Sequence, residues 1–168
     1  GPEKLSGTNF RVFYNTTDCP PYAGGQVNCV PNTTTGGGNN EYASRMLNIS
    51  EGCREEYANF GFLPGWNPVA PDKFPFNLKW CDGGGCAGGW GFGLAPQYLG
   101  TYDPNTNTGD PGSLLVPIHE LFHMVQFSYD SLRTDPDGSW AIEGQARAIQ
   151  DLACVNAGGI ICQNVDDE

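Results

Sequence analysis

Apolar residues recur at helical spacing between residues 41 and 60. They fall three or four positions apart, so they line one face of a helix that can bury this face against a core. Asn39 or Asn40 is expected to cap the start of the helix, and Gly61 is expected to end it. The apolar positions are Tyr42, Met46, Ile49, Cys53, Tyr57 and Phe60.

Other stretches have the composition of β-strands. Residues 10–14 and 74–80 are rich in aromatic side chains and predict strands, and residues 97–102 predict a further one. Two more helices are expected at about 114–130 and 139–155. Because strands and helices do not follow a regular βαβ order, we expect an α+β domain with a small sheet packed against two or three helices.

Residues 81–93 are dominated by glycine. Gly83, Gly85 and Gly88 fit the spacing G-x-G-x-x-G, but dinucleotide binding requires a helix to open there, and more glycine and aromatic residues follow instead. The stretch is interpreted as the rim or edge strand of a cleft, where a substrate backbone could pair. A disulfide-pinned surface loop is an alternative of equal weight.

The composition is typical of one soluble domain. Hydrophobic residues make up 39% and charged residues only 16% of the chain, which argues against disorder. The net charge of −11 opposes binding to nucleic acid and to anionic membranes. No apolar run is long enough to span a bilayer. Gly1-Pro2 resembles the remnant of a cleaved tag, so the domain is assigned to residues 3–168, with its oligomeric state left open.

Seven cysteines in a chain of this size indicate an oxidising, extracellular compartment. Short separations in sequence suggest three disulfides, although spacing alone does not determine connectivity. Cys53 is left over, either as a buried free thiol or as the partner of a cysteine outside this sequence. The expected pairs are Cys19 with Cys29, Cys81 with Cys86, and Cys154 with Cys162.

The segment from His119 to His123 has the pattern H-E-x-x-H. Residues four apart on a helix share one face, so both imidazoles can reach one metal ion. Glu120 then lies beside the ion, where it can accept a proton from an activated water. The alternative is an ordinary helix that carries two histidines, but the chain has only two, and chance rarely gives this spacing. The apolar stripe that anchors this helix comprises Ile118, Leu121, Phe122 and Val125.

A catalytic zinc ion keeps three protein ligands and one open position, so a third ligand is required. Glu143 is the best candidate, because two antiparallel helices joined by a short loop would bring it opposite the histidines. A solvated helix carboxylate is the alternative. Gly144 is expected to let another backbone or side chain approach closely.

H-E-L-F-H followed by W-A-I-E-G-Q-A at residues 140–146 resembles the gluzincin metallopeptidases, the thermolysin-like group, and in particular secreted hyicolysin-like members. The resemblance implies a zincin-like fold, in which a small twisted sheet packs on an active-site helix and a glutamate-bearing helix. The chain ends soon after Glu143, so the lower subdomain would be largely absent. Arg147 stands where many gluzincins have an aspartate. No histidine remains to stabilise the tetrahedral intermediate, which leaves that role to Tyr98, Tyr102 or Tyr129.

The sequence therefore predicts a secreted zinc-dependent endopeptidase of the gluzincin type, with a protein or peptide as substrate. His119, His123 and Glu143 would hold one catalytic zinc ion. Glu120 would act as general base. The alternative is a catalytically inactive zincin-like module, or an extracellular module that binds glycans or proteins. Candidates for supporting or cleft residues are Gln126, Trp140, Arg147 and Tyr129.

Two polar loops also suggest a calcium site, because their carboxylate and amide oxygens are the ligands that calcium prefers. Plain turns are the alternative for both loops. The residues are Asp103, Asn105, Asn107 and Asp110 in one loop, and Asp135 and Asp137 in the other.

Overall fold

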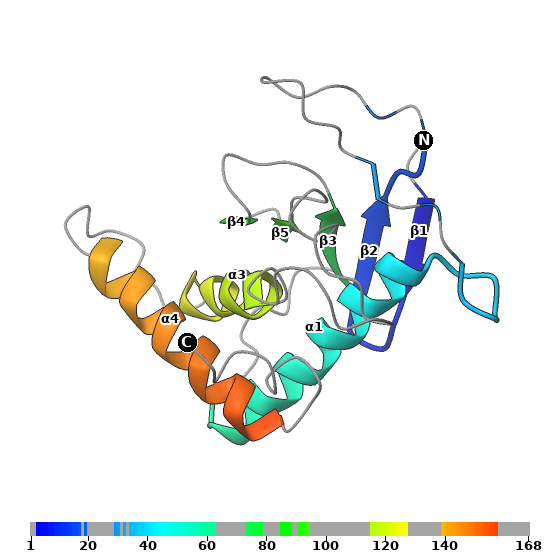
Figure 1. The fold of residues 1–168 in the computed structure, drawn as a ribbon. Coiled ribbons are helices and arrows are strands. Elements are labelled where there is room, and N and C mark those ends of the chain that lie inside the picture. Colours follow the sequence, from blue (N-terminus) through cyan, green and yellow to red (C-terminus); the bar gives the residue numbers. More distant parts are fainter. Residues whose placement is uncertain are drawn as a thin grey trace.

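The structure is a computed structural model of the chain, drawn as a ribbon in Figure 1. Within the residues that it describes, five strands form one mixed sheet, and three helices lie on one side of that sheet. The predicted α+β class is confirmed. The described residues are 3–17, 19, 29–30, 32, 34–62, 73–78, 85–88, 91–94, 115–127 and 139–157.

The sheet has the strand order β1-β2-β3-β5-β4. The inner strands β2, β3 and β5 run parallel, whereas β1 and β4 run antiparallel to their neighbours at the two edges. Val12 and Phe76 are register partners and are both fully buried, so the strands share one apolar face. The strands are β1 (Glu3–Ser6), β2 (Phe10–Tyr14), β3 (Phe74–Leu78), β4 (Gly85–Gly88) and β5 (Gly91–Leu94).

The helices form two layers on the sheet. Helix α1 packs on β1 and β2, and α3 packs on β4 and β5. Helix α4 lies on α3 and α1, so it is the layer farther from the sheet (Figure 1). The helices are α1 (Glu41–Asn59), α3 (Leu115–Phe127) and α4 (Ser139–Ala157). All three predicted helices are therefore confirmed, with small shifts at their ends.

Helix α1 begins and ends as its sequence predicts. The Oδ1 atom of Asn40 accepts a hydrogen bond from the Ala43 amide at 3.0 Å, which satisfies one of the unpaired amides of the first turn. At the other end, Gly61 has a φ of 88°, a left-handed conformation that glycine adopts without strain. Of the two asparagines considered as caps, Asn40 is the one that caps the helix.

Helix α3 is fixed in the core along its apolar stripe. Ile118, Leu121, Phe122 and Val125 are all buried, as predicted. The Tyr57 hydroxyl of α1 donates a hydrogen bond to the Ile118 carbonyl at 2.5 Å, and the rings of Tyr57 and Phe122 meet edge to face. Pro117 is the third residue of α3, where its missing N–H costs nothing because first-turn amides have no partner within the helix.

The glycine-rich stretch forms an edge strand rather than a disordered or helical segment. β4 and β5 pair antiparallel as a hairpin, and β4 lies at the edge of the sheet. The expected edge strand is therefore found at residues 85–88, whereas the cleft and the disulfide of the two interpretations stay predictions. The β3 prediction is confirmed for residues 74–78. The last two residues of that predicted strand, and the strand predicted at 97–102, lie outside the described residues.

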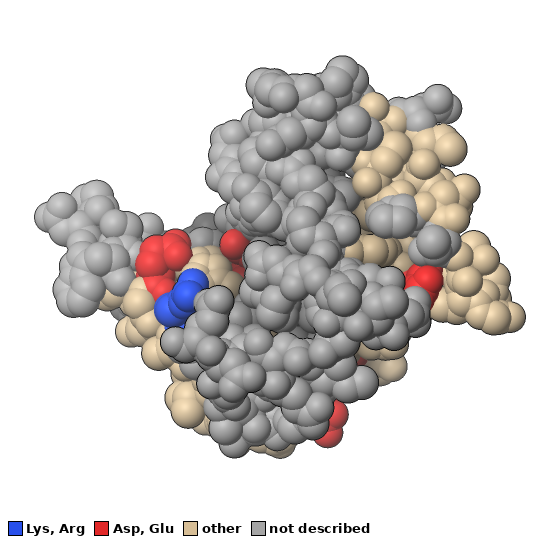
Figure 2. Space-filling view, in the orientation of Figure 1, with Lys and Arg blue, Asp and Glu red and all other residues tan. Residues whose placement is uncertain are grey.

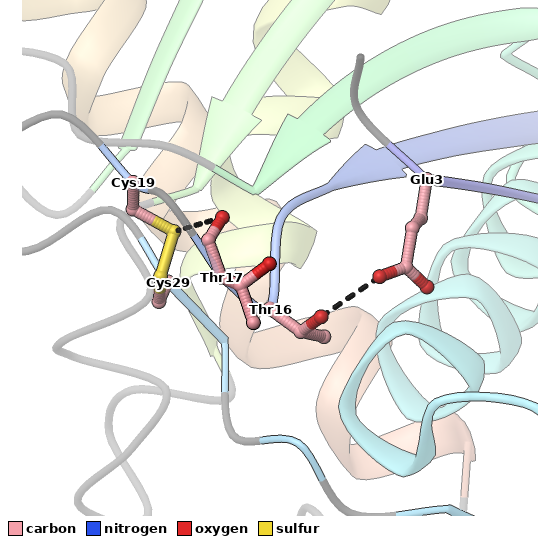
Figure 3. Close-up of a disulfide and its surroundings, with 5 residues drawn as sticks. All are labelled: Glu3, Thr16, Thr17, Cys19 and Cys29. Atoms are coloured by element: carbon pink, nitrogen blue, oxygen red, sulfur yellow. Dashed lines mark hydrogen bonds between the residues drawn. A yellow bond between two sulfur atoms is a disulfide. The ribbon is translucent and has the colours of Figure 1, made fainter.

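Cys19 and Cys29 form a disulfide, as predicted (Figure 3). Nearby, the Thr16 hydroxyl donates to the Glu3 carboxylate at 2.8 Å, so the segment after β2 is also tied to β1. Cys53 is a buried free thiol, and burial raises its pKa to about 12. The other two expected pairs involve side chains outside the described part of the chain. None of the described helices has the length and apolar character needed to cross a membrane.

Candidate metal centre

Helix α3 presents two imidazoles to the same point. His119 and His123 are one helical turn apart, and their ring centroids are 4.6 Å apart with the ring planes nearly perpendicular. The two Nε2 atoms face each other at 3.0 Å. Because the core fixes α3, the backbone beneath both rings is fixed as well.

Glu143 of α4 completes the cluster from the opposite side. Its Oε2 atom lies 3.1 Å from His119 Nε2, and its Oε1 atom lies 3.3 Å from His123 Nε2. The sequence prediction that these three side chains lie together is therefore confirmed in their geometry. Among the described residues they form the group of His, Cys, Asp and Glu side chains that could hold a metal ion.

The separations fit one small tetrahedral ion. Zinc binds histidine nitrogen at about 2.0–2.1 Å, so two ligands of a regular tetrahedron are separated by about 3.3 Å. The 3.0 Å between the two Nε2 atoms is close to this value, and each of them has one Glu143 oxygen at a similar distance, Oε2 at 3.1 Å from His119 and Oε1 at 3.3 Å from His123. Two imidazoles and one carboxylate are also the ligand types of hydrolytic zinc sites.

Glu120 lies beside the cluster on α3, and only 8% of it is exposed. Burial, and after it the charge of Glu143, raises the pKa of the Glu120 carboxyl from 4.5 to about 7. A carboxyl with a pKa in this range can both accept and release a proton near neutral pH.

The surroundings of His119 lower the pKa of its imidazole. Burial, and then the neighbouring His123, lowers its pKa, while Glu143 and a hydrogen bond with Gln150 act in the opposite direction. Metal binding requires an unprotonated ring nitrogen, so the lowered pKa favours the form that binds metal.

The cluster opens to solvent on the side of α4. The side chain of Glu143 is 64% exposed, compared with 19% for His119 and 7% for His123. Figure 2 shows acidic and basic side chains next to each other over the N-terminal half of α4, where Glu143 and Arg147 are exposed. An ion or a substrate would therefore reach the histidines past Glu143.

Of the predicted supporting residues, Gln126 lies against the cluster. Its Oε1 atom is 2.8 Å from His123 Nδ1, and its Nε2 atom donates to the Ile142 carbonyl and to Gln145. Arg147 is an exposed residue of α4. The Trp140 side chain, the three candidate tyrosines and both candidate calcium loops lie outside the described residues.

One expectation about α4 is wrong. A Cβ atom added at Gly144 would meet no heavy atom within 4 Å, and the residue is exposed. No described part of the protein approaches the backbone there. The helix faces outward at this turn, so the glycine is not required for close packing.

Gln150 was not identified from the sequence. It is 3% exposed and forms a hydrogen bond with His119. The available signal is its position seven residues after Glu143, because residues seven apart lie on the same face of a helix. A polar residue on the ligand-bearing face of α4 could have been listed among the supporting candidates on this basis.

Comparison of the chain with protein-family models, with curated proteins and with solved structures found no match.

Proposed function

We propose that this chain is a secreted zinc metallopeptidase of the gluzincin type with a zincin-like fold. The observation that supports the proposal most strongly is the convergence of His119, His123 and Glu143 to within 3.0–3.3 Å. These side chains come from two helices and are separated by up to 24 positions in sequence. Two imidazoles alone would suggest any divalent metal, but a carboxylate as third ligand beside both of them favours zinc with one open position.

Glu120 is the general base of the proposed reaction. A bound zinc ion supplies Lewis acidity to the scissile carbonyl and lowers the pKa of a water molecule. Glu120 accepts a proton from that water and delivers it to the leaving amine. Its raised pKa of about 7 suits both transfers, because a general base works best when its pKa is near the working pH.

The edge strand β4 offers a place for a peptide substrate. β4 packs against α3, the helix that bears both histidines, and within the described residues it has a strand neighbour on one side alone, β5. An extended peptide can add to such an edge through backbone hydrogen bonds. The proposed substrate is therefore a protein or peptide in extended conformation.

The proposed compartment is extracellular. The Cys19–Cys29 disulfide is compatible with an oxidising environment, and the net charge of −11 disfavours nucleic acid as a partner. The H-E-x-x-H pattern and the arrangement of the cluster both support His119, His123 and Glu143 as the ligands.

The test combines metal analysis with an assay on an unfolded, fluorescently labelled protein. The chain is expected to bind one equivalent of zinc and to hydrolyse the substrate. Glu120→Gln is expected to retain zinc and to reduce hydrolysis by about 10²–10⁴-fold, the range that general-base catalysis provides. Glu55→Gln, the same substitution at an exposed position of α1, is the matched control and should leave both properties unchanged.

Two results would contradict the proposal in different ways. Failure to bind zinc would remove the metal centre itself. Binding of zinc without hydrolysis of any protein substrate would favour the alternative, an inactive zincin-like or glycan- or protein-binding module.

A further inference from the structure

Gln126 has an orientation that its neighbours determine. It is 2% exposed, and its Nε2 atom donates to the Ile142 carbonyl oxygen at 2.8 Å. A carbonyl oxygen can only accept hydrogen bonds, so the amide nitrogen must be on that side. The Oε1 atom therefore faces His123 Nδ1, at 2.8 Å.

This orientation decides the tautomer of His123. The amide oxygen of Gln126 can only accept, so Nδ1 of His123 must carry the hydrogen. In the neutral ring the lone pair is then on Nε2. That nitrogen is the atom that faces His119 Nε2 and Glu143 Oε1. The ring therefore presents an electron pair, rather than a proton, to the centre of the cluster.

The same amide also connects the two helices that supply the ligands. Ile142 directly precedes Glu143, so the hydrogen bond to its carbonyl holds the backbone of α4 next to the third ligand. Gln145, two residues after Glu143, accepts a second hydrogen bond from Gln126 Nε2 at 3.1 Å. The buried Gln126 side chain thus contacts His123 on α3 and binds α4 on both sides of Glu143 in the sequence.

We propose that Gln126 is a positioning residue that prepares His123 as a metal ligand and sets the register of Glu143 against it. The proposal rests on the proposed function, because it assigns to Gln126 the support of the same metal centre. It also assigns that support to a neutral amide, whereas metal-bound histidines are often held by a carboxylate.

The tautomer can be measured without metal and without an assay of activity. The chain has two histidines, so protein labelled with ¹⁵N-histidine gives two ring systems that a His119→Asn variant assigns. At alkaline pH, where imidazole is neutral, His123 of the metal-free chain is expected to be protonated at Nδ1 and unprotonated at Nε2. Protonation at Nε2 in the wild-type chain would overturn the proposal, whatever the chain does with zinc.

Substitution tests the consequence for the metal. Gln126→Leu is close in size and makes no hydrogen bonds, so His123 should lose its single tautomer, and the zinc affinity should fall by about 10–100-fold. Asn48→Leu also replaces an amide by leucine, at an exposed position of α1, and should alter the zinc affinity by less than about threefold. Equal effects of the two substitutions would overturn the proposal.

The two proposals fail in distinguishable ways. If His123 has the expected tautomer but the chain does not bind zinc, the metallopeptidase proposal is wrong. If the chain binds zinc and hydrolyses protein while His123 is protonated at Nε2 in the metal-free state, the role of Gln126 is wrong and the proposed function stands. Because the spectrum of the wild-type chain decides the tautomer, a poorly folded Gln126→Leu variant would not prevent the test.

Discussion

The two helices of the candidate metal centre differ in how firmly the protein holds them. In α3, the side chains of residues 118–126 are buried, apart from the partly exposed His119. In α4, the described side chains are mostly exposed, and only Ala146 and Gln150 are fully buried. The histidines therefore have positions determined by the core, whereas Glu143 depends on a few contacts of a surface helix.

This difference separates two costs of building a metal site. The imidazoles are ordered as the core packs, so their conformational entropy is lost during folding. The Glu143 side chain keeps more freedom in the folded chain, because it is 64% exposed, and in the proposed site it would lose this freedom only when an ion bound. Half of the site is thus prepared in advance, and the other half can adjust to the ion.

Removal of one proposed ligand from each helix should give the largest effect on zinc affinity. The same variants should show whether α3 is held more firmly than α4. His123→Ala and Glu143→Ala should each weaken zinc binding by about a hundred- to a thousandfold, because zinc sites with four ligands bind with about 10–16 kcal/mol in total. In the metal-free chain, however, the two substitutions should differ in their effect on the free energy of unfolding. His123→Ala should lower the free energy of unfolding by about 2–4 kcal/mol, because it leaves a cavity and an unpaired Oε1 atom on the buried Gln126.

Glu143→Ala should change the free energy of unfolding by less than about 0.5 kcal/mol, since the side chain is exposed. Zinc titration against a competing chelator and urea denaturation of the metal-free chain measure the two quantities. Equal destabilisation by both substitutions would mean that α4 is held as firmly as α3.

The pH dependence of the metal-free chain should reveal the burial of Glu120. Its pKa is about 7 in the folded chain, compared with an ordinary value of 4.5, so between these values the folded state binds more protons than the unfolded state. The stability should therefore fall as the pH rises from about 4.5 to about 7 and should then level off. The loss should be at most roughly 3–4 kcal/mol, because the rise of the pKa from 4.5 to about 7 corresponds to 1.36 kcal/mol per pKa unit.

Glu120→Gln should remove this slope, so the variant should be more stable than the wild type at neutral pH and similar to it near pH 4.5. His119, whose pKa is lowered, contributes a slope of opposite sign at acidic pH, but it is present in both proteins and is removed by the comparison. Denaturant midpoints of the two metal-free chains over this pH range provide the measurement. Parallel curves would show that Glu120 is solvated in the folded state.

The smallest expected effect concerns the exposed turn of α4. Gly144→Ala should stabilise the chain by about 0.5–1 kcal/mol, because alanine is a better helix former and a Cβ atom there meets nothing within 4 Å. Gly52→Ala in α1 is the matched control, since Gly52 is also helical and free of contacts. A loss of hydrolysis in Gly144→Ala alone would indicate that a substrate approaches the α4 backbone at this point.

The parts of the structure that follow from local sequence were predicted well. The stripe of α3 and the spacing of its histidines depend on helical periodicity, and the ends of α1 depend on Asn40 and Gly61. The approach of Glu143 was also predicted, because a catalytic zinc site needs a third ligand and two antiparallel helices joined by a short loop would bring Glu143 opposite the histidines.

The contacts that were missed join residues distant in sequence. The hydroxyl of Tyr57 reaches Ile118 across 61 positions, and no periodicity in either helix indicates that pairing. The position of Gln150, seven residues after Glu143, indicates its helix face but not its partner, His119, which is on another helix. The expectation for Gly144 was wrong because a glycine in a helix can mark either close approach of a neighbouring segment or an exposed position without neighbours. The sequence does not distinguish the two, and the packing does.

The Cys53 thiol in the middle of α1 provides a natural reporter of unfolding. Its burial and its pKa of about 12 keep it in the unreactive thiol form while α1 stays on the sheet. A thiol-specific reagent can therefore modify it only when that helix separates from the core, and the labelling rate measures how often this happens. The same protection allows the unpaired Cys53 to coexist with the Cys19–Cys29 disulfide without exchanging with it.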